Sequence, residues 1–486
     1  MPCSVGRIAK SASEIRLFRQ SANSYGGKVF LHPMRTTKKS RRNKTTGQDD
    51  PSSADFLFLS HKKNAIRSSK RTKKLPQLHS QVVAKHHPNL PTSDMGSYGD
   101  DVIVADNEHL LTSTQHPFRH SISFIPSTTA QCHASSLLLL DGGDVLCAWF
   151  GGSQEGRKDI SIYTSRLSSA STRWSGAQQV TFDGKKSEQN PVLFKTPTGE
   201  IWLLYTSQNA GDQDSAVVKR QISRDEGRTW SSSTVLFSDP GTFIRQPMIV
   251  LDNGDWLLPI FRCRTEPGTR WIGNDDISAV RVTSDQGRTW TEREVPNSFG
   301  AVHMQVQRLK DGSYLALFRS RWADYIYLAT SPNALDWTEP RPTSLPNPNA
   351  SICFDVLPSG RVLVVYNDSS RADAIGQREG LYDDVKAEGD DRQNQRSMHG
   401  GRQAFWGAPR APLCLAWSDD DGGTWNSRVL EEGDGYCMTN NSEQKLNREL
   451  SYPSMVLSPD GVVHIAFTFW RQRIKYVRLL PEDIAA

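Results

Sequence analysis

The stretch SDDDGGTW, residues Ser418–Trp425, places three acids, two glycines and a tryptophan within eight positions. The same pattern of Ser or Thr, Asp, Gly, Thr and Trp returns as SRDEGRTW, residues Ser223–Trp230, and as TSDQGRTW, residues Thr283–Trp290. Two shorter copies, SSASTRW and SPNALDW, end at Trp174 and Trp337. Internal similarity of this kind indicates a repeat architecture.

Clustered aspartates are typical of metal sites, but this pattern favours a turn. Only one acid, seen as Asp225, Asp285 and Asp420, keeps its place relative to the glycine and the tryptophan, whereas the positions of Asp419 and Asp421 vary between copies. An Asp in a turn accepts hydrogen bonds from N–H groups two or three residues on, and glycine supplies a positive φ. We therefore predict scaffolding here, and no metal.

A second repeat supplies the strands. Six times an apolar run, a glycine turn and another apolar run follow one another, as in IVLDNGDWLLPIFR, which is a strong hairpin signal. The sequence predicts an all-β, six-bladed β-propeller over residues 117–481. Residues 119–127 are expected to close the ring as an added strand beside the last hairpin. Residues 371–408, polar and without apolar alternation, are expected to form an insertion in blade five.

The first 94 residues differ from the rest. The whole chain carries a formal net charge of +5, but the basic residues concentrate in runs such as RTTKKSRRNK, and the body is mildly acidic. We expect residues 1–94 to be a disordered basic tail, and Met95 is a candidate true start. A nuclear-localisation or polyanion-binding role for the tail stays open, and no nucleic-acid partner is expected for the folded body.

Nothing in the sequence indicates a cofactor. The seven cysteines are scattered without metal-ligand spacing, and we expect them to be buried free thiols. The sequence shows no secretory signal and no apolar run long enough to span a membrane. The cytoplasm is therefore the default expectation, although an acid-poor N-terminus leaves an organelle transit peptide open. The sequence leaves the oligomeric state undetermined.

The repeated turns resemble the Asp-boxes, or BNR repeats, of the sialidase superfamily. The resemblance covers residues 117–481 and implies a divergent sialidase-like propeller of the exo-α-sialidase class, with an acidic carbohydrate as substrate. In this family a tyrosine nucleophile replaces the usual carboxylate. An acidic partner serves that tyrosine, an Asp acts as general acid and base, and three arginines hold the carboxylate of the sugar.

The resemblance can be carried onto particular residues. Tyr452, shortly before the last hairpin, resembles the nucleophile. Arg319, after the fourth hairpin, and Arg410, before the last Asp-box, resemble two of the arginines, with Arg321 as an alternative to the first. Asp159 resembles the general acid, and Glu155 is its rival.

Two family positions are changed. His133 stands where the first arginine is expected, and His303 and Gln305 stand where the acidic partner of the tyrosine is expected. Glu449 or Glu188 could supply the base by another route, and His303 could itself take a phenolic proton.

Other side chains are expected to reach the centre: Arg245, Gln189, Asn190, Trp322, Trp406 and the loop GDGYCMTNNS. Three functions stay open. The first is a retaining glycosidase acting through Tyr452. The second is a hydrolase or lyase for a different acidic glycan, in which His133 and His303 move protons. The third is a propeller that binds a glycan or a protein without catalysis.

Overall fold

A computed structural model describes residues 109–113, 120–382, 385, 401–441 and 444–485 of the 486-residue chain. The predicted basic tail and Met95 lie outside these residues, as does much of the predicted insertion. The described chain forms six antiparallel sheets that follow one another in sequence. The prediction of a six-bladed β-propeller is confirmed.

The blades are numbered along the chain. Blade one is β3 (Gln131–Leu139), β4 (Val145–Gly152), β5 (Ser161–Leu167) and β6 (Gln178–Gln179), and blade two is β7 (Ser187–Lys195), β8 (Ile201–Asn209), β9 (Asp212–Ser223) and β10 (Thr234–Phe237). Blade three is β11 (Thr242–Phe243), β12 (Ile249–Val250), β13 (Trp256–Arg262), β14 (Ile277–Thr283) and β15 (Thr291–Glu294), and blade four is β16 (Ala301–Arg308), β17 (Tyr314–Ser320), β18 (Tyr325–Ser331) and β19 (Arg341–Pro346).

Blade five is β20 (Cys353–Val356), β21 (Val362–Asn367), β22 (Leu413–Ser418) and β23 (Asn426–Glu431). Its second and third strands pair directly, and the connection between them carries the 3-10 turn η2 (Arg371–Asp373). Blade six is β24 (Leu450–Leu457), β25 (Val463–Phe469) and β26 (Arg473–Leu479), extended by β2 (His120–Ile125) and β1 (Leu111–Ser113). A short helix, α1 (Pro481–Ala485), follows.

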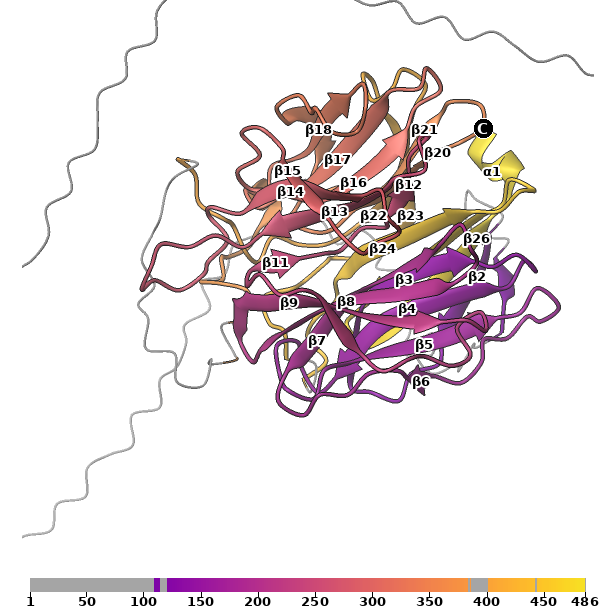
Figure 1. Cartoon of the computed structure of the whole chain (residues 1–486), viewed down its shortest axis with the longest axis horizontal. Coiled ribbons are helices and arrows are strands. Elements are labelled where there is room, and N and C mark those ends of the chain that lie inside the picture. The colour runs from indigo at the N-terminus through magenta and orange to yellow at the C-terminus, as the bar shows by residue number, and fades with distance from the viewer. Residues whose placement is uncertain (1–108, 114–119, 383–384, 386–400, 442–443, 486) are drawn as a thin grey trace, which may run out of the picture. The chain divides into compact units, whose positions relative to one another are not determined.

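The ring closes by pairing strands from the two ends of the folded body. Strand β2 pairs with β26 along its whole length, from His120 opposite Leu479 to Ile125 opposite Ile474, and Figure 1 shows the two strands side by side. The prediction of a closing strand within residues 119–127 is confirmed over His120–Ile125. No helix among the described residues is long and apolar enough to cross a membrane.

A hydrophobic core lies at each junction between neighbouring blades. The core between blades one and two, for example, contains Phe150, Leu203 and Tyr205, and equivalent cores join the other blades around the ring. Both faces of a blade are therefore buried, which explains the nearly continuous apolar runs of the second strands. The six described cysteines are buried and unbridged.

The Asp-box turns are built as the sequence predicts. Asp420 Oδ1 accepts the N–H of Thr424 at 2.8 Å, and its Oδ2 accepts the Thr424 hydroxyl at 2.9 Å. Asp225 and Asp285 make the same bonds to their own box threonines. These bonds lower the pKa of all three aspartates, because they stabilise the charged form.

The box glycines also bring neighbouring blades together. A Cβ at Gly422 would lie 2.7 Å from Leu328 of blade four, and one at Gly287 would lie 2.4 Å from Trp202 of blade two. Both glycines have positive φ, 89° and 83°. Glycine is therefore required here for the turn and for the contact between blades.

The Asp-boxes should make stability sensitive to acid. Their folded-state pKa values lie below the unfolded value of about 3.9, so they stabilise the fold above that pH and lose this contribution progressively as the pH falls below about 4 toward the folded-state pKa values. We expect the triple variant Asp225→Asn, Asp285→Asn, Asp420→Asn to melt at a lower temperature at pH 7. Its melting temperature should also fall less steeply between pH 5 and 3.

Thermal unfolding followed by circular dichroism measures both effects. Asp421→Asn, at a position that other boxes fill with Glu226 or Gln286, is the control and should behave like wild type. A triple variant with the wild-type slope below pH 4 would contradict this account.

Candidate active site

The first strands of four blades carry a bulge near their start, where the pairing register of β3, β7, β16 and β24 shifts. Within these bulges lie Ala134, Asn190, His303 and Tyr452, with φ of 59°, 49°, 53° and 53°. Positive φ is strained for a bulky residue, and such strain gathers at functional sites. The bulges aim selected side chains of four blades at one end of the ring.

Three guanidiniums surround the ring of Tyr452. The Cζ atoms of Arg245, Arg319 and Arg410 lie 5.4, 5.5 and 5.6 Å from its centroid. Arg319 Nη1 also donates a hydrogen bond of 2.5 Å to the Tyr452 hydroxyl. The structure thus brings Tyr452, Arg319 and Arg410, predicted from the sequence, to one buried place, together with Arg245.

Two of these arginines lack a carboxylate partner among the described residues. Arg245 donates to the carbonyl oxygens of Tyr452 and Pro453, at 3.1 Å each, and Arg319 donates to Asn349 Oδ1 at 2.7 Å. Burial lowers the pKa of Arg319 to about 9 and that of Arg245 to about 10. Arg319 Nη2 and Arg245 Nε have no hydrogen-bond partner in the described structure. Both therefore retain unused donors.

Glu449 forms ion pairs with two guanidiniums, those of Arg410 and Arg471. Its carboxylate accepts Arg471 Nε at 2.6 Å and Arg410 Nη1 at 3.1 Å, and the Ser451 hydroxyl at 2.9 Å. Burial opposes the charged form, but the two guanidiniums outweigh it and lower the pKa of Glu449 to about 2. Arg471 bridges onward to Glu155. Glu449 is therefore a charged anchor whose oxygens are occupied.

Two histidines flank Tyr452. The ring of His133 lies 4.1 Å from the Tyr452 ring, and that of His303 lies 5.6 Å away. Burial, followed by the charges of nearby arginines, lowers the pKa of both well below the usual range, so both are neutral near pH 7. Arg319 Nη1 lies 3.5 Å from His303 Nε2, and because a guanidinium can only donate, that nitrogen is an acceptor.

The predicted general acid lies in different surroundings. Asp159 is exposed, and its carboxylate accepts the N–H and hydroxyl of Ser153 at 2.7 and 2.9 Å. Its rival Glu155 is buried and bonded to Arg471. The structure therefore joins Glu155 to the cluster around Tyr452 and shows Asp159 as a loop-capping acid.

Arg321 is committed to another partner. Its Nε and Nη2 both donate to Asp276 Oδ2, at 2.9 and 2.7 Å, and both residues are buried. The backbone carbonyl of Arg321 accepts the N–H of Phe405, and its guanidinium lies 5.2 Å from the Trp406 ring. Arg321 therefore holds Phe405 and Trp406, in the connection between β21 and β22, against the propeller.

Sequence reasoning missed Arg471, Asp276, Asn349 and Tyr382. Arg471 lies in a turn where it and Trp470 both have positive φ. No local sequence pattern predicts this turn or the position of Arg471. Tyr382 comes from the polar connection between β21 and β22, yet its hydroxyl contacts Gln208 and Gln189 of blade two. Its only signal was an aromatic residue within a polar segment.

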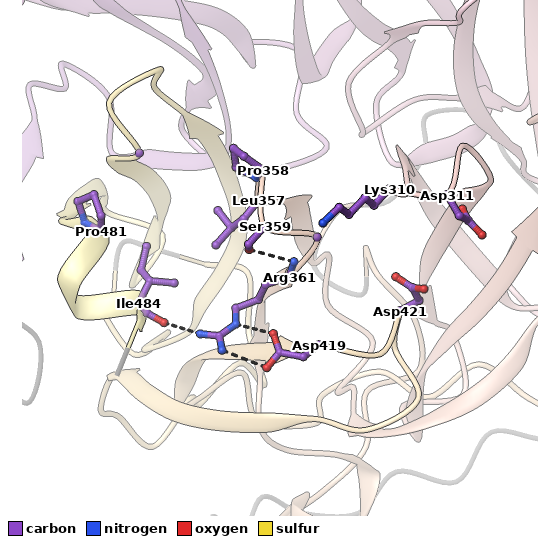
Figure 2. Close-up of a pocket in the computed structure, with 12 residues that line it drawn as sticks. Lys310, Asp311, Leu357, Pro358, Ser359, Arg361, Asp419, Asp421, Pro481 and Ile484 are labelled. Carbon is purple, nitrogen blue, oxygen red and sulfur yellow. Dashed lines mark hydrogen bonds and ion pairs between the residues drawn. The ribbon is translucent and has the colours of Figure 1, made fainter.

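A cavity lies at the end of the ring opposite Tyr452. The first strands run from Tyr452 and His303 at their starts to the hairpin glycines at their ends. There a cavity of about 840 Å³ is lined by residues of the hairpin turns and by α1. Figure 2 shows Arg361 in this cavity, bonded to Asp419 and to the carbonyl of Ile484. The charges of Arg361 and Asp419 are thus paired, unlike those of Arg245 and Arg319.

The comparisons with known proteins agree with the repeats and the blades. The BNR repeat-like domain matches residues 143–465. The chain belongs to this family. A search of the curated proteins finds no match to the sequence.

Solved structures similar to this BNR repeat protein include several sialidases. The Hadza microbial sialidase Hz136 has 16% identity and a TM-score of 0.54, over 73% of this chain and 66% of the other. The NanB sialidase of Streptococcus pneumoniae has 12% identity and a TM-score of 0.52, over 76% and 71%. The intramolecular trans-sialidase of Ruminococcus gnavus has 12% identity and a TM-score of 0.51, over 73% and 95%. At these identities the likeness establishes a sialidase-like fold.

Glu449 should be required for stability. Glu449→Gln leaves Arg471 and Arg410 less compensated in a buried site, and breaking a buried ion pair costs about 3–5 kcal/mol of unfolding free energy. Urea denaturation at pH 7 measures this. The wild-type contribution should persist above about pH 4.3 and be lost as the pH falls toward 2, since folding depresses the pKa of Glu449.

Glu432→Gln is the matched control, because Glu432 is an exposed acid. Equal unfolding free energies for the two variants would contradict the assigned role of Glu449.

Proposed function

We propose that this protein is a glycoside hydrolase that removes a terminal acidic sugar with retention of configuration, and that Tyr452 is its nucleophile. The observation that carries the proposal is the pair of buried guanidiniums, Arg319 and Arg245, beside Tyr452 without a described carboxylate partner. A buried cation is unfavourable unless it is paired. The carboxylate of a bound acidic sugar would supply the missing charge, and guanidinium geometry suits it.

The charge balance of the cluster supports an anionic ligand. Arg245, Arg319, Arg410 and Arg471 bring four positive charges, whereas Glu449 and Glu155 bring two negative charges. Both histidines are neutral near pH 7 because their pKa values are lowered. The cluster therefore has an excess of positive charge, and the guanidiniums without a carboxylate partner, Arg245 and Arg319, lie beside Tyr452. The sialidase-like fold supports this chemistry by analogy.

In the proposed first step, the Tyr452 oxygen attacks the anomeric carbon and the bond from that carbon to the leaving oxygen breaks. The phenolic proton passes to a base, and the leaving oxygen takes a proton from a general acid. Water then attacks the same carbon, releases the sugar and restores the phenol. Arg319 and Arg245 hold the carboxylate of the sugar. Arg410 is bonded to Glu449 and lies beside the Tyr452 ring.

His303 is the base that the geometry favours. Glu449 has its oxygens occupied by two guanidiniums and a hydroxyl, whereas His303 is neutral and its Nε2 is an acceptor on the side of Arg319 and Tyr452. The pKa of His303 is also lowered, but its acceptor nitrogen is engaged only by the long 3.5 Å contact from Arg319, which leaves it freer to take a proton than the doubly salt-bridged carboxylate. The general acid is Glu155 or Asp159.

A second candidate function has an observation of its own. His133 and His303 lie on two sides of Tyr452, and each has an unpaired buried ring nitrogen in the described structure, His133 Nε2 and His303 Nδ1. Two neutral histidines suit a hydrolase or lyase for a different acidic glycan, in which both imidazoles move protons.

Replacing the nucleophile should abolish turnover. Tyr452→Phe keeps the ring but removes the attacking oxygen, so we expect kcat to fall by about 10³-fold or more. A panel of fluorogenic acidic glycosides measures it, and mass spectrometry of the wild type with a slow substrate should find the sugar on the Tyr452 peptide.

Tyr476→Phe is the control, since Tyr476 is also buried and is bonded to His464 in blade six. Equal turnover by Tyr452→Phe and wild type would remove Tyr452 as nucleophile. No turnover by the wild type on any glycoside, with glycan binding retained, would favour a binding propeller.

The acidic limb of the pH profile should report His303. Protonated imidazole cannot accept a proton, so wild-type kcat/KM should decline as the pH falls through the pKa of His303, below 6.5. His303→Gln should lower kcat and remove that acidic limb.

His464→Gln is the matched control, because His464 is buried with a pKa lowered to about 4 but bonds to Tyr476. An unchanged acidic limb in His303→Gln would assign the base elsewhere.

A further inference from the structure

Asn349 holds arginines from two neighbouring blades. It lies in the connection between β19 and β20 and is only 1% exposed. Its side-chain Oδ1 accepts Arg319 Nε at 2.7 Å, and its backbone carbonyl accepts Arg410 Nη2 at 3.1 Å. Arg319 belongs to β17 of blade four, whereas Arg410 precedes β22 of blade five. One residue therefore contacts two of the guanidiniums that surround Tyr452.

The same side chain fastens the connection between β21 and β22. Asn349 Nδ2 donates to the carbonyl oxygen of Phe405 at 2.9 Å, and the Phe405 N–H donates to the carbonyl oxygen of Arg321 at 2.8 Å. The next residue, Trp406, is buried, and the guanidinium carbon of Arg319 lies 5.9 Å from the centre of its ring. Asn349 thus holds Arg319 directly and holds the neighbouring indole through Phe405.

The chemistry of the partners fixes the orientation of this amide. A guanidinium can only donate hydrogen bonds, and a carbonyl oxygen can only accept them. The amide oxygen must therefore face Arg319, and the amide nitrogen must face Phe405. The backbone of Asn349 has φ of 56°, a conformation in which asparagine and aspartate are enriched among residues other than glycine. Asparagine therefore suits both the turn and the two partners.

Asn349 holds Arg319 without neutralising it. The carboxylate of Glu449 compensates the charge of Arg410 as it accepts its N–H. The amide of Asn349 accepts the N–H of Arg319 in a similar way but carries no charge. Arg319 Nη2 also has no hydrogen-bond partner in the described structure. The Arg319 guanidinium is therefore oriented by a neutral partner and keeps both its charge and an unused donor.

We propose that Asn349 is a positioning residue that orients Arg319 and Arg410 and leaves the charge of Arg319 for the carboxylate of the ligand. This inference rests on the proposed function, because it takes the ligand to be an acidic sugar. A role confined to the turn would make glycine an adequate replacement, because glycine adopts positive φ without strain. The positioning role instead requires the neutral side chain.

Pairs of ligands that differ in one charge test the proposal. The probes are N-acetylneuraminic acid and its methyl ester, with D-glucuronic acid and its methyl ester as a second pair, and calorimetry measures their binding to the full chain. Asn349→Asp keeps the shape and the acceptor but adds a carboxylate beside Arg319. It should weaken binding of the acid by about 10-fold or more, the size of one charge-assisted hydrogen bond. Binding of the ester should change much less.

Asn349→Gly separates positioning from charge. Glycine retains the positive φ and the backbone carbonyl that binds Arg410, but it removes both hydrogen bonds of the amide. Binding of the acid should fall by about 3- to 10-fold, less than in Asn349→Asp and more than binding of the ester. A role in packing predicts the opposite order, because aspartate resembles the native side chain more closely than glycine does. Thermal unfolding checks the fold, and Asn349→Gly stays informative if Asn349→Asp is unstable.

Asn297→Asp is the matched control. Asn297 also has positive φ, 49°, but it is exposed and its side chain bonds to Glu339. The variant makes the same chemical change at a turn without a guanidinium contact, so all affinities should stay at the wild-type value.

The outcomes separate the two proposals. Wild-type binding of the acid by Asn349→Asp, or equal losses of acid and ester, would overturn the positioning role and leave the proposed function standing. Binding of neither acid by the wild type would overturn both. Selective loss of the acid, in a protein whose wild type hydrolyses no glycoside, would support the positioning role and contradict the catalytic proposal.

Discussion

The pairing of β2 with β26 is the constraint on which the structure depends. It joins the first described strands of the folded body to its last hairpin, and it brings blade six against blade one across a core that contains Trp149 and Tyr476. Tyr452 of blade six then packs into the core between blades one and two. The arginines around it come from blades three to five. A ring that failed to close would scatter these side chains, so the site is a property of closure.

The site concentrates charge where the fold excludes water. Glu449 compensates Arg410 and Arg471, but Arg245 and Arg319 remain without a described carboxylate. Buried ion pairs contribute little net stability, because desolvation offsets their attraction. An incompletely compensated cluster is less favourable still. In the proposed function this cluster is preorganised for an anion, since fixed guanidiniums need not reorganise when the ligand arrives.

The sequence was sufficient for the fold because the deciding information is local. Glycine hairpins and Asp-boxes specify turns within a few residues, and counting from them located Tyr452, Arg319 and Arg410. The partners of these residues were harder to find. Arg321 lies two positions after Arg319, but only the folded arrangement shows that it pairs with Asp276, 45 residues earlier. Arg471 depends on two successive residues of positive φ. Tyr382 depends on the path of a connection whose polar composition carries no periodic signal.

The acids of this protein show that a lowered pKa has two different meanings. Asp420 is stabilised in its charged form by neutral donors, the N–H and hydroxyl of Thr424, at an exposed turn. Glu449 is stabilised by two guanidiniums inside the fold, against the effect of burial. Removing Asp420 would release ordinary donors to water, whereas removing Glu449 would leave two buried cations uncompensated. The acidic cluster at residues 418–425 therefore stabilises a turn. The charge of the buried arginines is balanced instead by Glu449, which lies outside any acidic cluster in the sequence.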